Sequence, residues 1–275
     1  MANQRYEHHL LLNEKLCPFI IGNEVTGDKV VANWHRNIEI LVILDGEGYC
    51  QYGAEEKTIK ANDIIIVNSG TLHRPHSQGS LIYEYLIIDE DFCLRNGIST
   101  ENVLFENQFC DEKTKALFLN AIKRIKEYKN NKENSYSAPQ AINAVLSLLI
   151  DICLNHVKNK EETDKTQSIS EKYVKKVIEY ISDNFCEQIS LDELAKMCNI
   201  TKFHLIREFK RYTGQTVFTY INILKCKKAQ VCLMNGLTVT ETATECGFDS
   251  VSYFSQVYKK IMGYPPTKNK KTKAP

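Results

Sequence analysis

The sequence lacks the cysteine and histidine patterns of common redox and zinc sites. Its ten cysteines form no C-x-x-C pair and no His/Cys cluster at zinc-ligand spacing, so we expect reduced and mostly buried thiols. It also lacks an apolar leader, because its first residues, MANQRYEHHLLLNEK, are mixed and polar. No run of about 18 apolar residues is present to span a membrane. These absences predict a cytoplasmic protein without a membrane segment.

The composition is that of an ordinary globular protein, but the charge is unevenly distributed. The chain has 275 residues, of which 43% are hydrophobic and 25% charged, and this length predicts two domains. Residues 168–275 carry 17 Lys and Arg against 10 Asp and Glu, whereas residues 1–167 carry 18 against 24. The basic C-terminal part therefore predicts a polyanionic partner.

Two copies of one pattern organise that C-terminal part. They are SLDELAKMCNITKFHLIREFKRYTG, Ser190–Gly214, and TVTETATECGFDSVSYFSQVYKKIMG, Thr238–Gly263. Each begins with the capping-box pattern, in which a hydroxyl and a later glutamate bind free amides of a helix start: Ser190 with Glu193, and Thr238 with Glu241. Asn199 and Gly247 fall where a left-handed turn residue is needed. Each copy therefore predicts a helix, a tight turn and a second helix.

The second helix of each copy carries an outward face suited to DNA, since a helix-turn-helix inserts this helix into the major groove. In the first copy the outward set is Lys202, Phe203, Ile206, Arg207 and Lys210. In the second copy it is Val251, Ser252, Ser255 and Gln256, with Lys259 and Lys260 placed for phosphates. We expect Arg207 to bind guanine and Gln256 to bind adenine. The alternative is a plain helical hairpin with a solvated face.

A single helix should join the two copies. The segment VFTYINILKCKKAQVCLMNG predicts one helix that ends at Gly236. A helix of about 17 residues rises about 26 Å. With a compact unit at each end, it would hold the two recognition helices about one DNA turn, or about 34 Å, apart. One chain would then contact two adjacent segments of the major groove.

Residues 170–272 resemble the DNA-binding domain of the AraC/XylS family of bacterial transcription regulators. The resemblance rests on Leu194-Ala195, LIREFKRYTG, the helix with Lys225, Ala229 and Leu233, and above all GFDSVSYFSQVYKKIMGYPP. It implies base contacts from part of the outward sets: Phe203, Ile206, Arg207, Val251, Ser252, Ser255 and Gln256. Three departures from the family pattern stand in this chain: Lys225 for Arg, Thr242 for an aliphatic residue, and Asn269-Lys270 for an aromatic-Arg ending. We expect Thr242 to loosen the packing of its helix.

The N-terminal part predicts a small β-structure followed by helices. Residues 1–90 alternate short β-branched and aromatic runs with turn residues, as in VVANWHRNIEILVILDGEGYC. Apolar side chains at helical spacing predict two helices between residues 111 and 157. These cover the barrel, and the family resemblance implies that one of them also forms a dimer contact. The polar segment HVKNKEETDKTQSIS is typical of a linker.

Two short motifs in the N-terminal part resemble those of the cupin barrels. NWHRNIE, residues 33–39, followed by Gly46, resembles the first motif, and NSGTLH, residues 68–73, resembles the second. The resemblance implies an α+β fold with three parts. These are a cupin-like β-barrel domain with two following helices over 1–158, a linker over 159–169, and an all-α domain of two helix-turn-helix units over 170–275.

The cupin motifs carry a candidate site at His35, Glu39 and His73. Metal-binding cupins use two His, a Glu and a later His, but here Asn33 replaces the first His and Asn68 replaces a usual Pro. The remaining groups match a two-His, one-carboxylate ligand set. Sensor cupins of this regulator family imply instead a small-molecule pocket without metal. We predict no metal and no other cofactor; metal binding and structural hydrogen bonding are the alternatives.

Further side chains are candidates for the same pocket: Trp34, Arg74, Tyr83 and Tyr85. Alternation along a strand puts Glu39 on the face of His35 and points Trp34 the other way, unless Trp34 lies at the barrel mouth. Tyr83 and Tyr85 share a face, as do Arg74 and His76. An aromatic, hydrogen-bonding pocket suits a sugar or another polyol. A fatty acid or an aromatic acid is the alternative ligand.

The sequence thus predicts a ligand-responsive, sequence-specific DNA-binding activator of a sugar-utilisation or related catabolic operon, and not an enzyme. The expected partners are double-stranded DNA, a small-molecule effector, a second copy of the chain and RNA polymerase. One alternative is a metal-dependent cupin enzyme fused to a DNA-binding domain. Another is a DNA repair or architectural protein with weak sequence preference.

Overall fold

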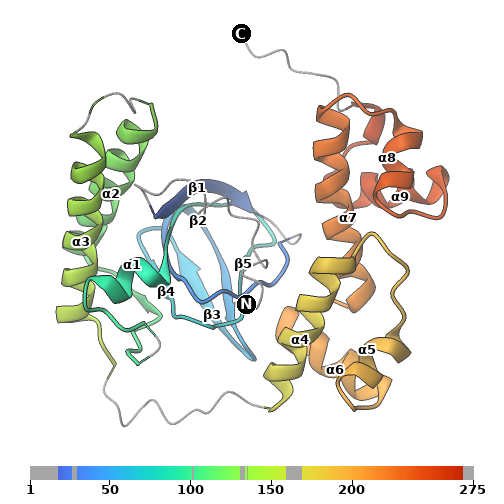
Figure 1. Cartoon of the computed structure of the whole chain (residues 1–275), viewed down its shortest axis with the longest axis horizontal. Coiled ribbons are helices and arrows are strands. Elements are labelled where there is room, and N and C mark those ends of the chain that lie inside the picture. The colour runs from blue at the N-terminus through green and yellow to red at the C-terminus, as the bar shows by residue number, and fades with distance from the viewer. Residues whose placement is uncertain are drawn as a thin grey trace. The chain divides into compact units, whose positions relative to one another are not determined.

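The chain forms two compact units. A computed structural model describes residues 18–26, 30–100, 102–130, 134, 136–158 and 169–268. The first unit spans Met1–Ser168 and the second Ile169–Pro275 (Figure 1). Residues 159–168 of the predicted linker, and the departure at Asn269-Lys270, lie outside the described residues.

An antiparallel sheet that turns over on itself makes up the first unit. Its strands are β1 (Phe19–Thr26), β2 (Ile38–Tyr52), β3 (Glu55–Lys60), β4 (Ile64–Val67), β5 (His73–His76), β6 (Leu81–Ile88) and β7 (Gln108–Phe109). The first half of β2 pairs with β4 and β6, and its second half pairs with β3 and β5. The 15-residue strand β2 therefore belongs to both halves of the sheet. This arrangement confirms the predicted cupin-like barrel.

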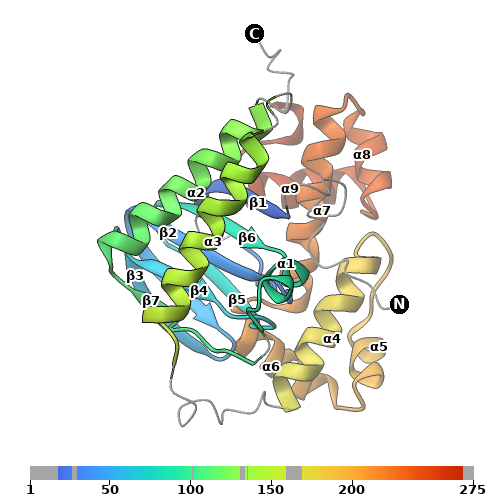
Figure 2. The same ribbon diagram turned by 60° about the vertical axis from the view of Figure 1, so that its left-hand side comes forward.

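Alternation along β2 separates two apolar clusters. Ile38, Ile40 and Val42 face the helices, whereas Leu41 and Ile43 face the interior between the two halves of the sheet. The helices are α1 (Glu90–Arg95), α2 (Glu112–Asn130) and α3 (Ser137–Asn155). Figure 2 shows α2 and α3 side by side across one face of the sheet. One face of the sheet is thus covered by helices, and the other lines the barrel interior.

Helix α3 is long and apolar enough to cross a membrane by length and composition alone. Half of its most apolar stretch is buried within the protein. Val145, Leu148 and Leu149 are fully buried in the cluster that also contains Ile40 of β2. These contacts are those of a core helix that covers a sheet.

The second unit is helical and contains the predicted repeat. Its elements are α4 (Ile169–Asn184), α5 (Leu191–Met197), α6 (Lys202–Thr213), α7 (Val217–Met234), α8 (Val239–Glu245), α9 (Val251–Met262) and the 3₁₀ helix η3 (Pro266–Lys268). Helices α5 and α6 form one helix-turn-helix, α8 and α9 form the other, and α7 joins them (Figure 1). The predicted all-α domain is therefore confirmed.

The turns and caps follow the sequence pattern with one difference. Asn199 and Gly247 have the expected left-handed backbone, with φ of 54° and 68°. At α8 the capping box between Thr238 and Glu241 is complete. At α5 the Ser190 side chain accepts from the Glu193 amide, but the Glu193 carboxylate accepts from the Tyr180 hydroxyl instead of returning to the cap. The prediction of a full capping box there was wrong, because Tyr180 on α4 competes for the carboxylate.

Candidate functional site

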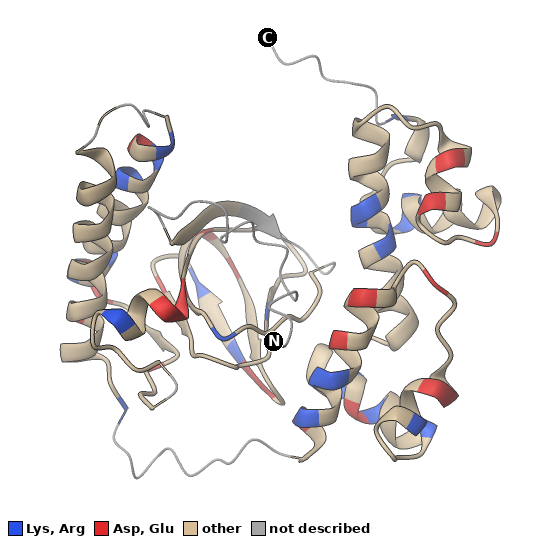
Figure 3. Cartoon of the chain, in the orientation of Figure 1, with Lys and Arg blue, Asp and Glu red and all other residues tan. Residues whose placement is uncertain are grey.

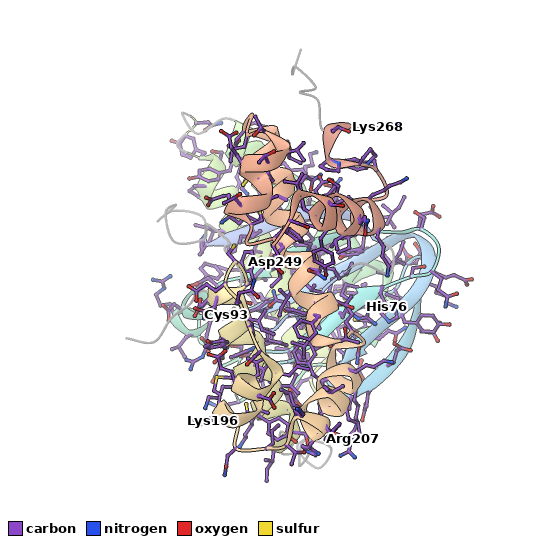
Figure 4. The ribbon with its side chains drawn as sticks, turned by 90° about the vertical axis from the view of Figure 1, so that its right-hand side faces the viewer. His76, Cys93, Lys196, Arg207, Asp249 and Lys268 are labelled. Atoms are coloured by element: carbon purple, nitrogen blue, oxygen red, sulfur yellow. The ribbon has the colours of Figure 1, made fainter. Side chains whose placement is uncertain are left out.

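Helix α6 separates an apolar buried face from an exposed face. Leu205 and Phe209 are fully buried, whereas the side chain of Phe203 is 76% exposed and that of Ile206 is 37% exposed. The basic members of the outward set, Lys202, Arg207 and Lys210, are exposed as well. Arg207 lies on α6 in the first helix-turn-helix unit (Figure 4). The exposed face of α6 thus contains all the residues that the sequence placed there.

Helix α9 has the same organisation with a less basic exposed face. Phe254 and Tyr258 are fully buried, and they pack against residues of α7 and α8. The outward set is exposed except for one half-buried serine: Val251, Ser252, Gln256 and Lys259 are exposed, and Ser255 is half-buried. Two uncharged polar side chains therefore face outward, together with Lys259 and Lys260 in the last turn of the helix. The second helix-turn-helix offers hydrogen bonds to bases and two charges to phosphates.

Charge is unevenly distributed over the helices of the second unit. Figure 3 shows Lys and Arg on α6 and α7, Asp and Glu on α8, and both kinds of residue on α4. Helix α6 alone carries Lys202, Arg207, Lys210 and Arg211 against Glu208. A helix with this charge is suited to a polyanion such as the DNA backbone.

The guanidinium of Arg207 is held by two neighbours that sequence analysis missed. Its Nε donates to Oε1 of Glu208 at 3.0 Å, and its Nη2 lies 2.9 Å from Nδ1 of His204. Glu208 is buried and also accepts from Arg211 at 3.2 Å. The sequence could have indicated the His204 contact, because His204 lies three residues before Arg207 on the same helix.

Two departures from the family pattern lie on the helices that support the second recognition helix: Thr242 on α8 and Lys225 on α7. Thr242 is fully buried, and among the described residues its hydroxyl oxygen has no hydrogen-bond partner. Lys225 is buried on α7, where its Nζ lies 5.3 Å from the centroid of the Phe248 ring. Burial lowers the pKa of Lys225. The unpartnered hydroxyl is consistent with the predicted looser packing of α8, because such a group costs free energy of folding.

His35, Glu39 and His73 converge inside the barrel. Oε2 of Glu39 lies 3.1 Å from Nε2 of His35 and 3.0 Å from Nε2 of His73. His35 precedes β2, so the turn before the strand, and not alternation within it, brings it to Glu39. Backbone hydrogen bonds in both directions between Asn33 and His73 fix the start of β5 beside this turn. The convergence agrees with the sequence, whereas ligand binding by the three residues remains a prediction.

Backbone carbonyls orient both imidazoles. Nδ1 of His35 lies 2.8 Å from the carbonyl oxygen of Asn37, and Nδ1 of His73 lies 3.0 Å from that of Thr71. Because a carbonyl only accepts, both Nδ1 atoms carry a proton and both Nε2 atoms face Glu39. Burial raises the pKa of Glu39, but hydrogen bonds and charge from the two imidazoles outweigh it and hold that pKa well below its usual range.

This donor set fits a divalent metal as well as a polar ligand. The three ligand atoms lie within 4.8 Å of one another. A carboxylate cannot accept from an unprotonated Nε2, so the cluster needs imidazolium protons, a cation or a donor group between its members. Asn33, which replaces the further His of metal cupins, uses its Oδ1 to accept from the Trp34 amide at 2.9 Å.

The other predicted pocket residues divide between two faces. Tyr83 and Tyr85 belong to the interior cluster, and their ring centroids lie 6.5 Å apart. Arg74 is opposite Gln51 in the register, one residue from the inward His73, so strand alternation places it on the outer face. Arg74 is nevertheless buried, and its place in the pocket remains a prediction. Trp34 is half-buried in the segment before β2.

A second acidic and histidine cluster lies where α2 begins and α3 ends. Ligand atoms of Asp111, Asp151 and His156 lie within 4.8 Å of one another. Protein donors occupy Asp151, which accepts from Lys113 at 2.5 Å and from Thr114 at 2.8 Å. The ammonium group bound to Asp151 disfavours a cation at this place, so the cluster ties the two helix ends together.

Comparisons with known proteins follow the same division of the chain. Residues 24–89 match the family model described as a cupin domain, and residues 194–272 match one described as a helix-turn-helix domain. The first match covers the strands that carry Glu39 and His73. The second covers both recognition helices.

Named relatives are regulators of transcription. An uncharacterised HTH-type transcriptional regulator, YdeC of Bacillus subtilis, is 25% identical over 96% of this chain and 94% of its own length. A second, from the cgkA 5' region of Pseudoalteromonas carrageenovora, is 30% identical over 42% of this chain and 69% of its own length. The xylose operon regulatory protein of Escherichia coli K12 is 29% identical over 36% of this chain and 26% of its own length. The chain therefore belongs to the AraC/XylS family of helix-turn-helix transcription regulators.

Proposed function

We propose that this protein is a ligand-responsive, sequence-specific activator of a sugar-utilisation or related catabolic operon. The observation that carries the DNA-binding part is the exposed face of α6. Phe203 and Ile206 project beside Arg207, whereas the opposite face is fully buried. Exposed apolar side chains next to an arginine suit thymine methyl groups next to a guanine. RNA polymerase is the further partner that an activator requires.

Selection of bound duplexes from a random DNA pool by the full chain tests sequence specificity. We expect a consensus that spans two adjacent major-groove segments. Arg207→Ala should relax the preference at one base pair and cost about 1–3 kcal/mol of binding free energy. An equal loss on every duplex would contradict base recognition by Arg207. A pool without a consensus would instead favour an architectural protein.

The interior of the barrel is the proposed effector site. His35, Glu39 and His73 supply hydrogen-bonding groups, and Tyr83 and Tyr85 supply aromatic rings on the inward face. This combination suits a sugar or polyol. The regulator of a xylose operon among the relatives supports the same class, although its match covers about a third of this chain.

A thermal-shift screen of sugars against fatty acids and aromatic acids tests the effector class. A sugar that binds the folded state should raise the melting temperature, with a shift that grows with the logarithm of its concentration above the dissociation constant. The shift should shrink in Glu39→Gln. A reporter gene downstream of the selected operator should rise in expression with that sugar. Repression by the sugar would contradict the activator assignment.

An exposed apolar strip on α3 is the proposed homodimer contact. Ile150 is 54% exposed and Leu154 is 78% exposed, one helical turn apart. Half-buried Cys153 lies beside them on the same helix. A second copy of the same strip would cover these side chains. Sedimentation of the full chain should show a dimer that Leu154→Glu dissociates, with Asn120→Glu, at an exposed position on α2, as control.

The orientation of the two imidazoles supports a second candidate function, a metal-dependent cupin enzyme. Both Nε2 atoms face Glu39 with their Nδ1 protons donated to backbone carbonyls, as in histidine metal ligands. His35, Glu39 and His73 would hold the ion, which would supply Lewis acidity to a bound substrate. Metal analysis of protein purified without chelators tests this. Occupancy near one ion per chain that disappears in Glu39→Gln would favour the enzyme.

A further inference from the structure

Five side chains form a closed ring of hydrogen bonds between α4 and α6. Ser170 and Tyr173, on the first two turns of α4, join their hydroxyls at 2.8 Å. The Tyr173 hydroxyl contacts Nε2 of His204, and Nδ1 of His204 lies 2.9 Å from Nη2 of Arg207. Arg207 donates to Glu208. Glu208 in turn is bound by the Ser170 hydroxyl, which closes the ring.

The chemistry of the donors fixes the direction of every bond in the ring. A guanidinium has no acceptor, so Nδ1 of His204 accepts from Arg207 and the imidazole proton lies on Nε2. That proton is donated to the Tyr173 oxygen, and Tyr173 donates to Ser170. The carboxylate of Glu208 only accepts, so Ser170 donates to it. Every bond of the ring is therefore compatible with a single arrangement of protons, which gives the ring one defined geometry.

The ring leaves Arg207 free to contact DNA. Two of the five N–H groups of a guanidinium are used by His204 and Glu208, and three remain. The side chain of Arg207 is 70% exposed, whereas that of Glu208 is 5% exposed. The anchoring side of the ring is therefore buried, and the unused donors face solvent. A guanidinium held at one edge loses less conformational entropy when its other edge binds a base.

We propose that His204 and Tyr173 are positioning residues that fix the guanidinium of Arg207 for recognition of one base pair. This inference rests on the proposed function of Arg207. Neither residue belongs to the outward set of α6, and Tyr173 reaches the recognition helix from α4. Ser170 completes the ring from the first turn of α4, the helix that begins at Ile169. The start of the DNA-binding unit is thus connected to a base-contacting side chain through two hydroxyl groups and an imidazole.

Tyr173→Phe is the test variant, because it removes one hydroxyl and keeps the ring packing. The measurement is the ratio of affinities of the full chain for its selected duplex and for the duplex changed at the base pair assigned to Arg207. We expect this ratio to fall about threefold to tenfold, the worth of one hydrogen bond. Affinity for random duplex and its salt dependence should stay unchanged. Ser170→Ala should act in the same direction.

Tyr180→Phe is the matched control. It lies on the same helix and loses one hydrogen bond, to Glu193 at 2.9 Å, that does not belong to the ring. Its discrimination ratio should equal that of the wild type. A double-mutant cycle gives the decisive comparison, since Tyr173→Phe should have no further effect once Arg207 is Ala. If both changes reduce the ratio additively, Tyr173 does not act through Arg207 and the inference is wrong.

The failure of this inference is distinguishable from failure of the proposed function. If Arg207→Ala leaves discrimination intact, base recognition by Arg207 fails first. If Arg207→Ala relaxes it while Tyr173→Phe and Ser170→Ala do not, only the positioning role fails. If Tyr173→Phe unfolds at a markedly lower temperature than the wild type, Ser170→Ala becomes the test variant.

Discussion

Nζ of Lys225, on α7, donates a hydrogen bond to the backbone carbonyl oxygen of Gly247 at 2.5 Å. Gly247 is the left-handed residue in the turn between α8 and α9, so this bond ties the joining helix to the turn of the second unit. Lys225 stands where the family resemblance implies Arg, and its ammonium group makes this tie. A buried cation therefore helps to position the turn of the second helix-turn-helix.

Lys225→Met should destabilise the protein by about 1–3 kcal/mol, because the Gly247 carbonyl loses its partner while the apolar stem is kept. Urea unfolding of the full chain measures this change in unfolding free energy, from the transition of the unit formed by Ile169–Pro275. Lys227→Met, at an exposed position on the same helix, is the control and should stay within about 0.5 kcal/mol. Equal losses of unfolding free energy in the two variants would show that this hydrogen bond makes no net contribution to stability.

Gly247→Ala should be more damaging than Gly263→Ala, although both glycines have a left-handed backbone. A Cβ at Gly247 would lie 1.7 Å from the carbonyl oxygen of Cys186, whereas a Cβ at Gly263 would meet nothing within 4 Å. We expect about 1 kcal/mol for Gly263→Ala from backbone strain alone and more than about 2 kcal/mol for Gly247→Ala. Thermal unfolding of both variants checks the order, and similar losses would contradict the clash.

Thr242→Val should raise the unfolding free energy of the unit formed by Ile169–Pro275 by about 1 kcal/mol. The two side chains have nearly the same shape, and the change removes a buried hydroxyl without a partner among the described residues. Thr240→Val, at an exposed position on the same helix, is the matched control for helix propensity and should be near neutral. A loss of stability in Thr242→Val would mean that the hydroxyl is satisfied in solution.

The protein should lose a defined part of its stability in acid through Glu208. Burial raises the pKa of this carboxyl, but hydrogen bonds from Arg207 and Ser170 and the charge of Arg211 outweigh it and lower the pKa in the folded state. The folded state then binds fewer protons, so this contribution is present above about pH 4.3 and disappears as the pH falls below it.

Unfolding free energies of wild type and Glu208→Gln between about pH 5 and pH 3 measure that contribution. The difference between the two proteins should shrink as the pH falls. A difference that stays constant over this range would contradict a lowered pKa of Glu208.

Lys259→Ala should weaken binding to all duplexes equally and lower the slope of log affinity against log salt concentration by roughly one. Lys259 is exposed in the last turn of α9, where it can reach a phosphate. Titrations of the selected duplex and a random duplex at several salt concentrations give both quantities. A loss confined to the selected duplex would assign Lys259 to a base instead.

Periodicity and caps were sufficient to predict the helical unit. Phe254 and Tyr258 recur at helical spacing and are fully buried, while Asn199 and Gly247 adopt the backbone that their turn requires. These features are local, because each depends on residues within a few positions in the chain. The barrel cluster was predictable for a different reason: the two motifs that contain His35, Glu39 and His73 resemble those of cupin barrels, which implies that these distant residues converge.

What the sequence could not supply were contacts between distant segments. The ring at Arg207 requires Tyr173 of α4. The Glu193 carboxylate does not complete the first capping box because it binds Tyr180, which also lies on α4. Residue type alone also could not indicate which side of β5 Arg74 occupies, because strand register decides this. Such contacts depend on how elements pack, which a single sequence does not determine.

Helix α7 contributes to the cores of both helix-turn-helix motifs: Tyr220 packs edge-on against Phe209 of α6, and Leu233 packs in the cluster that includes α8 and α9. Its 18 residues make a continuous rod about 27 Å long. A spacer anchored this way does not stretch, so if both recognition helices bind one duplex, we expect a mismatch with the helical repeat of DNA to be relieved by bending the duplex. Base pairs that neither recognition helix touches would then influence affinity through their flexibility.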